Sequence, residues 1–186
     1  CISSAASDVY KRQDIKLKSF VSKKNVVVGE QVIYKILLYS QNRIASITML
    51  SNQSFPGFWQ EWYPVPHSID GVVKQINGKS YQVYEIRKAA LFPTKSGVLS
   101  IPALKFELSI SDNSISFFSS QNRVFRFAPA VKINVNNVSE KAKNLPVGNF
   151  TFNVSSDKHE IDINDILTLK LEIKGEGNIK ILDIPG

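Results

Sequence analysis

The chain has 186 residues, 43% of them hydrophobic and 21% charged, and this balance excludes an intrinsically disordered protein. Its single cysteine, Cys1, excludes an internal disulfide framework and a cysteine-based zinc site. The net charge of +7 comes from lysines and arginines scattered along the chain. Because they form no basic block, they favour solvated strand faces over a nucleic-acid partner.

The first 12 residues differ from the rest of the chain. They open with Cys1 and a run of small, uncharged residues that ends before Asp8. Such a run is typical of the end of a secretory signal peptide. Cys1 also fits the lipid-carrying first residue of a bacterial lipoprotein, or an arbitrary start of the sequence. We expect an exported protein with residues 1–12 as a signal-peptide remnant or N-terminal tail. Since no run of 18 apolar residues occurs, a membrane anchor would lie outside this sequence.

Short runs that alternate apolar and polar residues begin near residue 13. Val32, Tyr34, Ile36 and Leu38 share one face of a predicted strand, because successive side chains point to opposite sides. The other face of this run is also partly apolar. We therefore expect a central strand that is covered on both faces.

The densest aromatic cluster lies within residues 55–64. Phe58, Trp59, Trp62 and Tyr63 are candidate partner-contact residues, since together they could form an exposed platform for a peptide or a glycan. In the alternative interpretation, Phe58 and Trp62 pack into the core while Trp59 and Tyr63 cover its rim.

Asn77-Gly78 marks the clearest turn of the chain, between strands predicted at Val72–Ile76 and Lys79–Arg87. Both turn residues accept positive φ, as a type I′ hairpin requires. Further strand-like runs follow a turn at residues 93–97: Val98–Ile101, Leu104–Ile110, Val124–Ala128 and Val131–Val135. Many short strands joined by turns are typical of a sandwich or barrel. We predict an all-β, immunoglobulin-like β-sandwich over residues 13–136.

The start of this pattern recurs 135 positions later in the chain. Apolar positions and the turn between them align without a gap: Ile15 with Phe150, Leu17 with Phe152, Val26 with Ile161, Val28 with Ile163, Val32 with Leu167, Tyr34 with Leu169, Ile36 with Leu171 and Leu38 with Ile173. A repeat of this length predicts two copies of one domain type. We expect a linker over residues 137–149 and the first strands of a second, incomplete immunoglobulin-like domain over residues 150–186.

Several segments carry a resemblance to a known family. They are Gly29-Glu30-Gln31-Val32, Ala90 to Pro102 (ALFPTKSGVLSIP), Val147-Gly148-Asn149-Phe150 and Gly175-Glu176-Gly177-Asn178, in that order. This set resembles the BatD family of bacterial envelope proteins, which is associated with oxygen tolerance. The resemblance covers about residues 20 to 186, and the middle segment is its most specific part.

The BatD resemblance implies an exported protein with β-rich domains on the periplasmic side of the bacterial inner membrane. It further implies a membrane anchor beyond these residues and partner proteins that carry von Willebrand A domains. It implies no catalytic residues.

Catalytic and metal-binding motifs are weak in this sequence. His67 and His159 lie in loop-like segments without a nucleophile at motif spacing, so ordinary loop histidines are favoured. The acidic residues around His159 lack the calcium-loop glycine and are predicted to be solvated turn carboxylates. Gly175-Glu176-Gly177 lacks the lysine of a phosphate loop and is interpreted as a turn between strands.

The sequence thus predicts a protein that is not an enzyme and needs no cofactor or metal. The favoured function is protein–protein interaction in the cell envelope, linked to oxygen or stress tolerance through partners with von Willebrand A domains. The alternative is a carbohydrate-binding or adhesin-type β-sandwich that uses the same aromatic residues.

Overall fold

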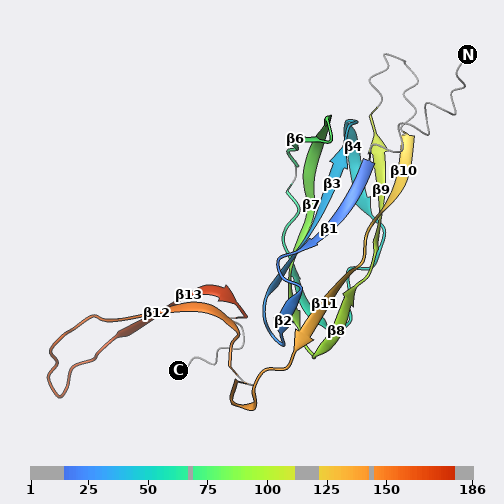
Figure 1. The fold of residues 1–186 in the computed structure, drawn as a ribbon. Helices are drawn as coiled ribbons and strands as arrows, with labels where there is room; N and C mark the ends of the chain where they lie inside the picture. The colour runs from blue at the N-terminus through green and yellow to red at the C-terminus, as the bar shows by residue number, and fades with distance from the viewer. Residues whose placement is uncertain (1–14, 67–68, 112–121, 143–144, 179–186) are drawn as a thin grey trace, which may run out of the picture.

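The computed structural model describes residues 15–66, 69–111, 122–142 and 145–178, and apart from one 3-10 turn the regular structure of these residues is all β-strand. The all-β prediction is confirmed. Strands β1 to β11 build a two-layered sandwich, and β12 and β13 form a separate two-stranded ribbon (Figure 1). A single 3-10 turn at Glu140–Ala142 lies between the two parts. Cys1, the predicted tail at residues 1–12, and His67 lie outside the described residues.

The first layer is a five-stranded antiparallel sheet in the order β1-β3-β7-β5, with β6 also paired to β7. The strands span β1 Ile15–Val21, β3 Val32–Ser40, β5 Phe58–Trp62, β6 Val72–Ile76 and β7 Lys79–Pro93. β3 is central, as predicted. Its outer face is covered in part, because Leu37 packs against a small cluster of Tyr39, Tyr81 and Val83.

The second layer consists of two three-stranded sheets, β10-β9-β4 and β2-β11-β8. The strands span β2 Asn25–Val27, β4 Ile44–Met49, β8 Gly97–Ile101, β9 Leu104–Ile110, β10 Asn122–Ala128 and β11 Val131–Asn136. Prolines divide this layer. Ile101 pairs with Val131 and Leu104 with Ala128, so Pro102 and Pro129 fall in the same gap between the two ladders. Proline has no N–H to donate, which interrupts both strands at the same level.

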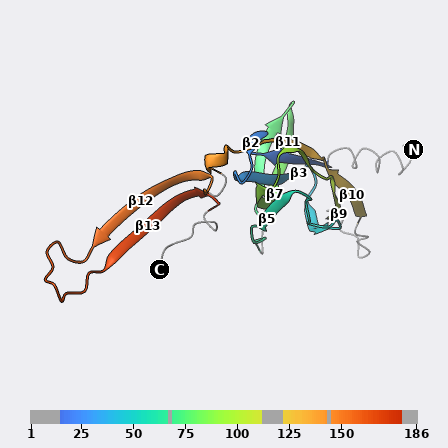
Figure 2. The same ribbon diagram turned by 90° about the horizontal axis from the view of Figure 1, so that it is seen from below.

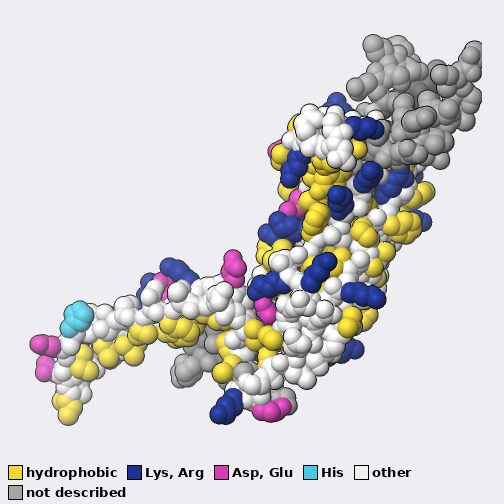
Figure 3. Space-filling model, in the orientation of Figure 1, with side chains coloured by type: hydrophobic (Ala, Val, Ile, Leu, Met, Phe, Trp, Pro, Cys, Tyr) yellow, Lys and Arg dark blue, Asp and Glu magenta, His cyan; other side chains and the backbone are white. Residues whose placement is uncertain are grey.

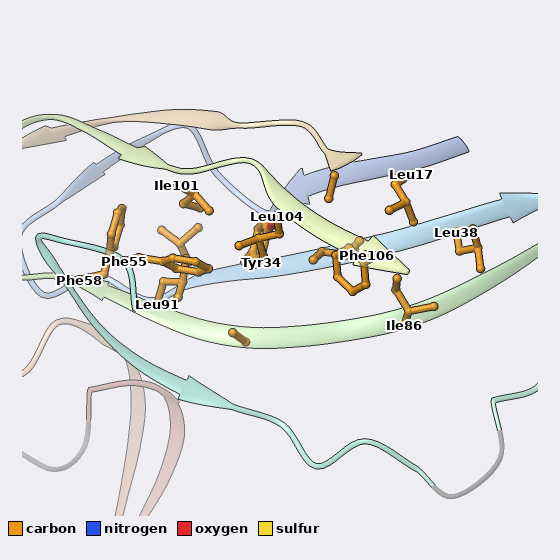
Figure 4. Packing of buried hydrophobic residues seen from close by; sticks show 14 of the residues in the cluster. Leu17, Tyr34, Leu38, Phe55, Phe58, Ile86, Leu91, Ile101, Leu104 and Phe106 are labelled. Atoms are coloured by element: carbon orange, nitrogen blue, oxygen red, sulfur yellow. The ribbon is translucent and has the colours of Figure 1, made fainter. Parts of the chain in front are cut away.

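One hydrophobic core fills the space between the two layers (Figure 4). The residues with fully buried side chains include Val32, Tyr34, Ile36, Leu38, Leu91, Ile101, Leu104, Phe106, Leu108 and Ile133. They alternate with more exposed residues along β3 and β9, as period-two strands require. Each such side chain contributes roughly 1.5–3 kcal/mol by leaving water, so this core holds the sandwich together without a disulfide.

The predicted hairpin at Asn77-Gly78 is confirmed. Ile76 pairs with Lys79, and the two turn residues have φ of 51° and 74°. These are the positive φ angles of a type I′ turn. The structure differs from the prediction at the far end of β7, because this strand continues past Arg87 to Pro93.

The ribbon consists of β12 (Gly148–Ser156) and β13 (Leu169–Gly177), and it projects away from the sandwich (Figures 1 and 2). The prediction of a turn at Gly175-Glu176-Gly177 is wrong, since these residues pair with Gly148 to Phe150 as the last part of β13. A Cβ atom at Gly175 would lie 2.8 Å from the Cα of Phe150. Glycine is therefore required at this position of the strand, because a side chain would collide with the backbone of the partner strand and with the phenylalanine ring.

Candidate interaction surface

Strand β5 divides the predicted aromatic cluster between two environments. It pairs with the end of β7, with Trp59 opposite Phe92 and Trp62 opposite Ala89. Because side chains alternate along a strand, Phe58 and Trp62 point into the sandwich and Trp59 points outward. The structure therefore does not bring the four candidate residues together on one surface.

The inward rings belong to the core. Phe58 is buried, and Trp62 packs edge-to-face against Phe55 and Tyr34, with ring centroids 5.7 and 6.5 Å away. The Tyr34 hydroxyl lies 3.3 Å from the Ser19 hydroxyl, and burial raises the pKa of Tyr34 above its usual value. Edge-to-face packing of this kind stabilises the sandwich, so Phe58 and Trp62 are not available to a partner.

The outward rings lie over the outer face of the first layer. Trp59 is 36% exposed and packs on Phe92 with ring centroids 4.8 Å apart, while Tyr63 is 42% exposed. The Tyr63 N–H donates to the Lys88 carbonyl at 3.0 Å, which extends the pairing of β5 with β7 by one residue. This bond holds the Tyr63 ring on the same side as Trp59, about 13 Å along the strand.

A lysine lies against the Tyr63 ring. The Lys88 ammonium lies 4.4 Å from the centroid of the Tyr63 ring, a cation–π arrangement. Lys35 pairs in register with Lys88 and forms a 2.8 Å ion pair with Glu85. We call Trp59, Tyr63, Lys88 and Lys35 the outer aromatic strip.

The whole outer face around this strip is more basic than acidic. Its charged residues on β1, β3, β5 and β7 include Lys16, Lys18, Lys35, Lys88, Glu61 and Glu85. The Lys18 ammonium lies 4.9 Å from the centroid of the Tyr39 ring, in a second cation–π contact. The face thus combines aromatic rings with a surplus of positive charge.

A hollow of about 390 Å³ lies beside Tyr63. Val65, Ile69, Ile86 and Arg87 contribute to its lining. The hollow lies where β7 has no strand on this side, because β5 pairs only as far as Ala89 and β6 only from Val83 backward. Tyr63 and Lys88 line this hollow and also belong to the outer aromatic strip.

The acidic residues around His159 form their contacts within one turn. Asp157 accepts a 2.9 Å hydrogen bond from the Thr168 N–H, and this bond lowers the pKa of its carboxyl. Asp165 forms a 3.1 Å ion pair with Lys158. Among the described residues, no three His, Cys, Asp or Glu side chains gather as a metal site. His159 lies exposed in the same turn.

Sequence reasoning missed Lys88 and Phe92 as part of the surface. Both lie on β7, and only the pairing of β5 with β7 brings them to Trp59 and Tyr63. The sequence does contain the alternation of β5, and this pattern places Phe58 and Trp62 on one face of the strand and Trp59 and Tyr63 on the other.

No helix in the described part of the chain is long and apolar enough to cross a membrane. Comparison of the sequence with protein-family models gave no match, and comparison with curated proteins gave none either.

Proposed function

We propose that this chain is a non-catalytic protein–protein interaction module of a BatD-like envelope protein. It works on the periplasmic side of the bacterial inner membrane, and its partners are envelope proteins with von Willebrand A domains. Through them it takes part in oxygen or stress tolerance. A membrane anchor outside these residues holds it in place.

The outer aromatic strip carries this proposal. Tyr63 exposes a large ring against Lys88, which pairs in register with Lys35, and Trp59 exposes a second ring further along the same strand face. Aromatic residues are enriched in protein interfaces, and lysines around them select an acidic partner surface.

Calorimetric titration of a von Willebrand A domain protein from the same organism tests this function. Trp59→Ala and Tyr63→Ala should each weaken binding about tenfold or more, because buried aromatic anchors dominate interface energies. Lys88→Ala should weaken it less, and raising the salt concentration should remove most of that difference.

Phe125→Ala is the matched control. Phe125 is also exposed and also carries a lysine over its ring, but it lies on β10 in the other layer. Equal losses for Phe125→Ala and Trp59→Ala, or no loss for either, would contradict the proposed surface. Thermal unfolding of each variant separates loss of binding from loss of fold.

A carbohydrate-binding surface is the second candidate, because Trp59 and Tyr63 are exposed on one strand face and could stack on sugar rings. Titration with soluble glycans distinguishes the two functions. Heat from direct glycan binding that disappears in Trp59→Ala would favour the second candidate over the first.

A further inference from the structure

The β12–β13 ribbon has two unlike faces. The side chains of one face are all polar: Asn149, Thr151, Asn153, Ser155, Lys170, Glu172, Lys174 and Glu176. The other is apolar except at its ends, and we call Phe150, Phe152, Val154, Leu169, Leu171 and Ile173 the apolar ribbon face. It forms a continuous hydrophobic stripe along the ribbon (Figure 3). Val154 is 66% exposed and Leu169 is 64% exposed.

This division matches a sheet with one buried and one solvated face. Strict alternation of apolar and polar residues arises where a sheet packs on one side only. A two-stranded ribbon is at best marginally stable in water without such packing. The apolar ribbon face therefore needs a covering layer, and the polar face does not.

The same strand pair occurs in the sandwich, where its apolar face is covered. Leu17 pairs with Leu38 and Ser19 with Ile36, and 135 positions later Phe152 pairs with Ile173 and Val154 with Leu171. The register is thus identical along both pairs. In the sandwich, Leu17, Ile36 and Leu38 are buried beneath the second layer.

The connection between the two strands is repeated as well. The Glu30 N–H donates to the Val27 carbonyl at 3.1 Å, and the Asp165 N–H donates to the Asp162 carbonyl at 2.9 Å. In each copy the acidic side chain also accepts from the backbone N–H three residues earlier, at 3.1 Å for Glu30 and 3.4 Å for Asp165.

Two further contacts are repeated in both copies: an ion pair and a hydrogen bond at the end of a strand. Lys23 pairs with Glu30 at 2.5 Å, and Lys158 pairs with Asp165 at 3.1 Å. The Ile33 N–H donates to the Ser22 hydroxyl as the Thr168 N–H donates to the Asp157 carboxylate, each at 2.9 Å. The ion pair uses a lysine and a carboxylate in both copies, whereas the strand-end hydrogen bond is made by unlike residues, so the backbone geometry itself is repeated.

We propose that the apolar ribbon face is one half of a second sandwich core, and that strands of this same chain beyond Gly186 cover it. In the first sandwich the cover comes from later strands of the chain, β9, β10 and β11. The Arg126 guanidinium of β10 closes it by donating to the Ile15 carbonyl at 3.0 Å. The covering segment supplies counterparts of these strands.

The segment that corresponds to β2, residues 160–162, shows how one strand of the covering segment must run. Val26 is buried because β2 pairs in parallel with β11. Its counterpart Ile161 and the neighbouring Ile163 are exposed, Ile163 at 99%. The missing segment therefore includes a strand that runs parallel to residues 160–162. Since β4 to β11 occupy residues 44–136, the segment is of similar length.

Thiol accessibility tests this proposal in the natural full-length protein and in the chain that ends at Gly186. With Cys1 and any cysteine beyond residue 186 replaced by serine, Val154→Cys introduces a single thiol on the apolar ribbon face, and Ser155→Cys is the matched control on the polar face. Both thiols should react rapidly with maleimide in the shorter chain. In the full-length protein Val154→Cys should react about tenfold or more slowly, while Ser155→Cys keeps its rate.

Leu171→Cys on the facing strand provides a second probe in case one variant fails to fold. Equal labelling of both faces in the full-length protein would overturn the proposal. So would protection in the shorter chain that grows with protein concentration, since a second copy would then be the cover. A natural chain that ends at Gly186 would overturn it too.

Discussion

Tyr34 shows how one polar group is accommodated in the core. Its ring is fully buried against Phe55 and Trp62, with ring centroids 5.8 and 6.5 Å away. Its hydroxyl lies next to the Ser19 hydroxyl, so the buried group has a hydrogen-bond partner. Burial disfavours the charged phenolate and raises the pKa of Tyr34 in the folded chain.

This raised pKa makes stability depend on pH in the alkaline range. Below about pH 10 both the folded and the unfolded chain hold the proton, so the stability is fully present. Above that pH the unfolded chain releases it first, and stability falls as the pH rises towards the folded pKa. Urea unfolding from about pH 8 to pH 11 should show a smaller loss for Tyr34→Phe than for the wild type. Identical slopes would show that Tyr34 does not titrate differently in the two states.

The placement of the aromatic residues was only partly predictable. One of the two interpretations from sequence is correct: Phe58 and Trp62 lie inside, and Trp59 and Tyr63 lie outside, as the alternation of the strand indicates. It cannot show that Trp59 covers Phe92, because that contact depends on the register between β5 and β7. Register is a property of the assembled sheet rather than of either strand alone.

At the scale of elements, the β6–β7 hairpin depends on its turn. Asn77 is the one non-glycine residue with positive φ in the described chain, and Gly78 follows it at φ 74°. A Cβ atom at Gly78 would meet no atom within 4 Å, so the cost of substitution comes from backbone strain rather than from a clash at Cβ.

Gly78→Val should therefore destabilise the hairpin by about 1–2 kcal/mol, and Gly78→Asn by much less, since asparagine tolerates this conformation. Hydrogen exchange of the β6 amides measures the effect directly. Similar exchange in both variants would mean that the turn does not hold β6 in place.

A bulge lies in two elements for which prediction and structure differ. β4 was not predicted, and its pairing with β9 shifts register between Ile44 and Ser46. β7 shifts against β3 between Ile36 and Leu37, where Ile86 is the extra residue. A bulge breaks the period-two pattern that identifies a strand, whereas the regular runs of β3 and β9 were found from sequence.

At the scale of the molecule, the sandwich has a core of its own. All residues of the main core lie between Ile15 and Val135, and the described ribbon residues contribute none of them. A chain ending at Val138 should therefore unfold within a few degrees of the temperature found for the whole chain. Scanning calorimetry measures this, and a drop well beyond about 5 °C would show that the ribbon supports the sandwich.

The parallel pairing of β2 with β11 has a mechanical consequence. Asn134 N–H donates to the Lys24 carbonyl at 2.8 Å and Val28 N–H to the Asn136 carbonyl at 3.0 Å. Because both strands run in the same direction, tension between the two ends of the sandwich draws β2 and β11 past each other lengthwise. Under such shear all the backbone hydrogen bonds between β2 and β11 bear the force at the same time, instead of breaking one after another.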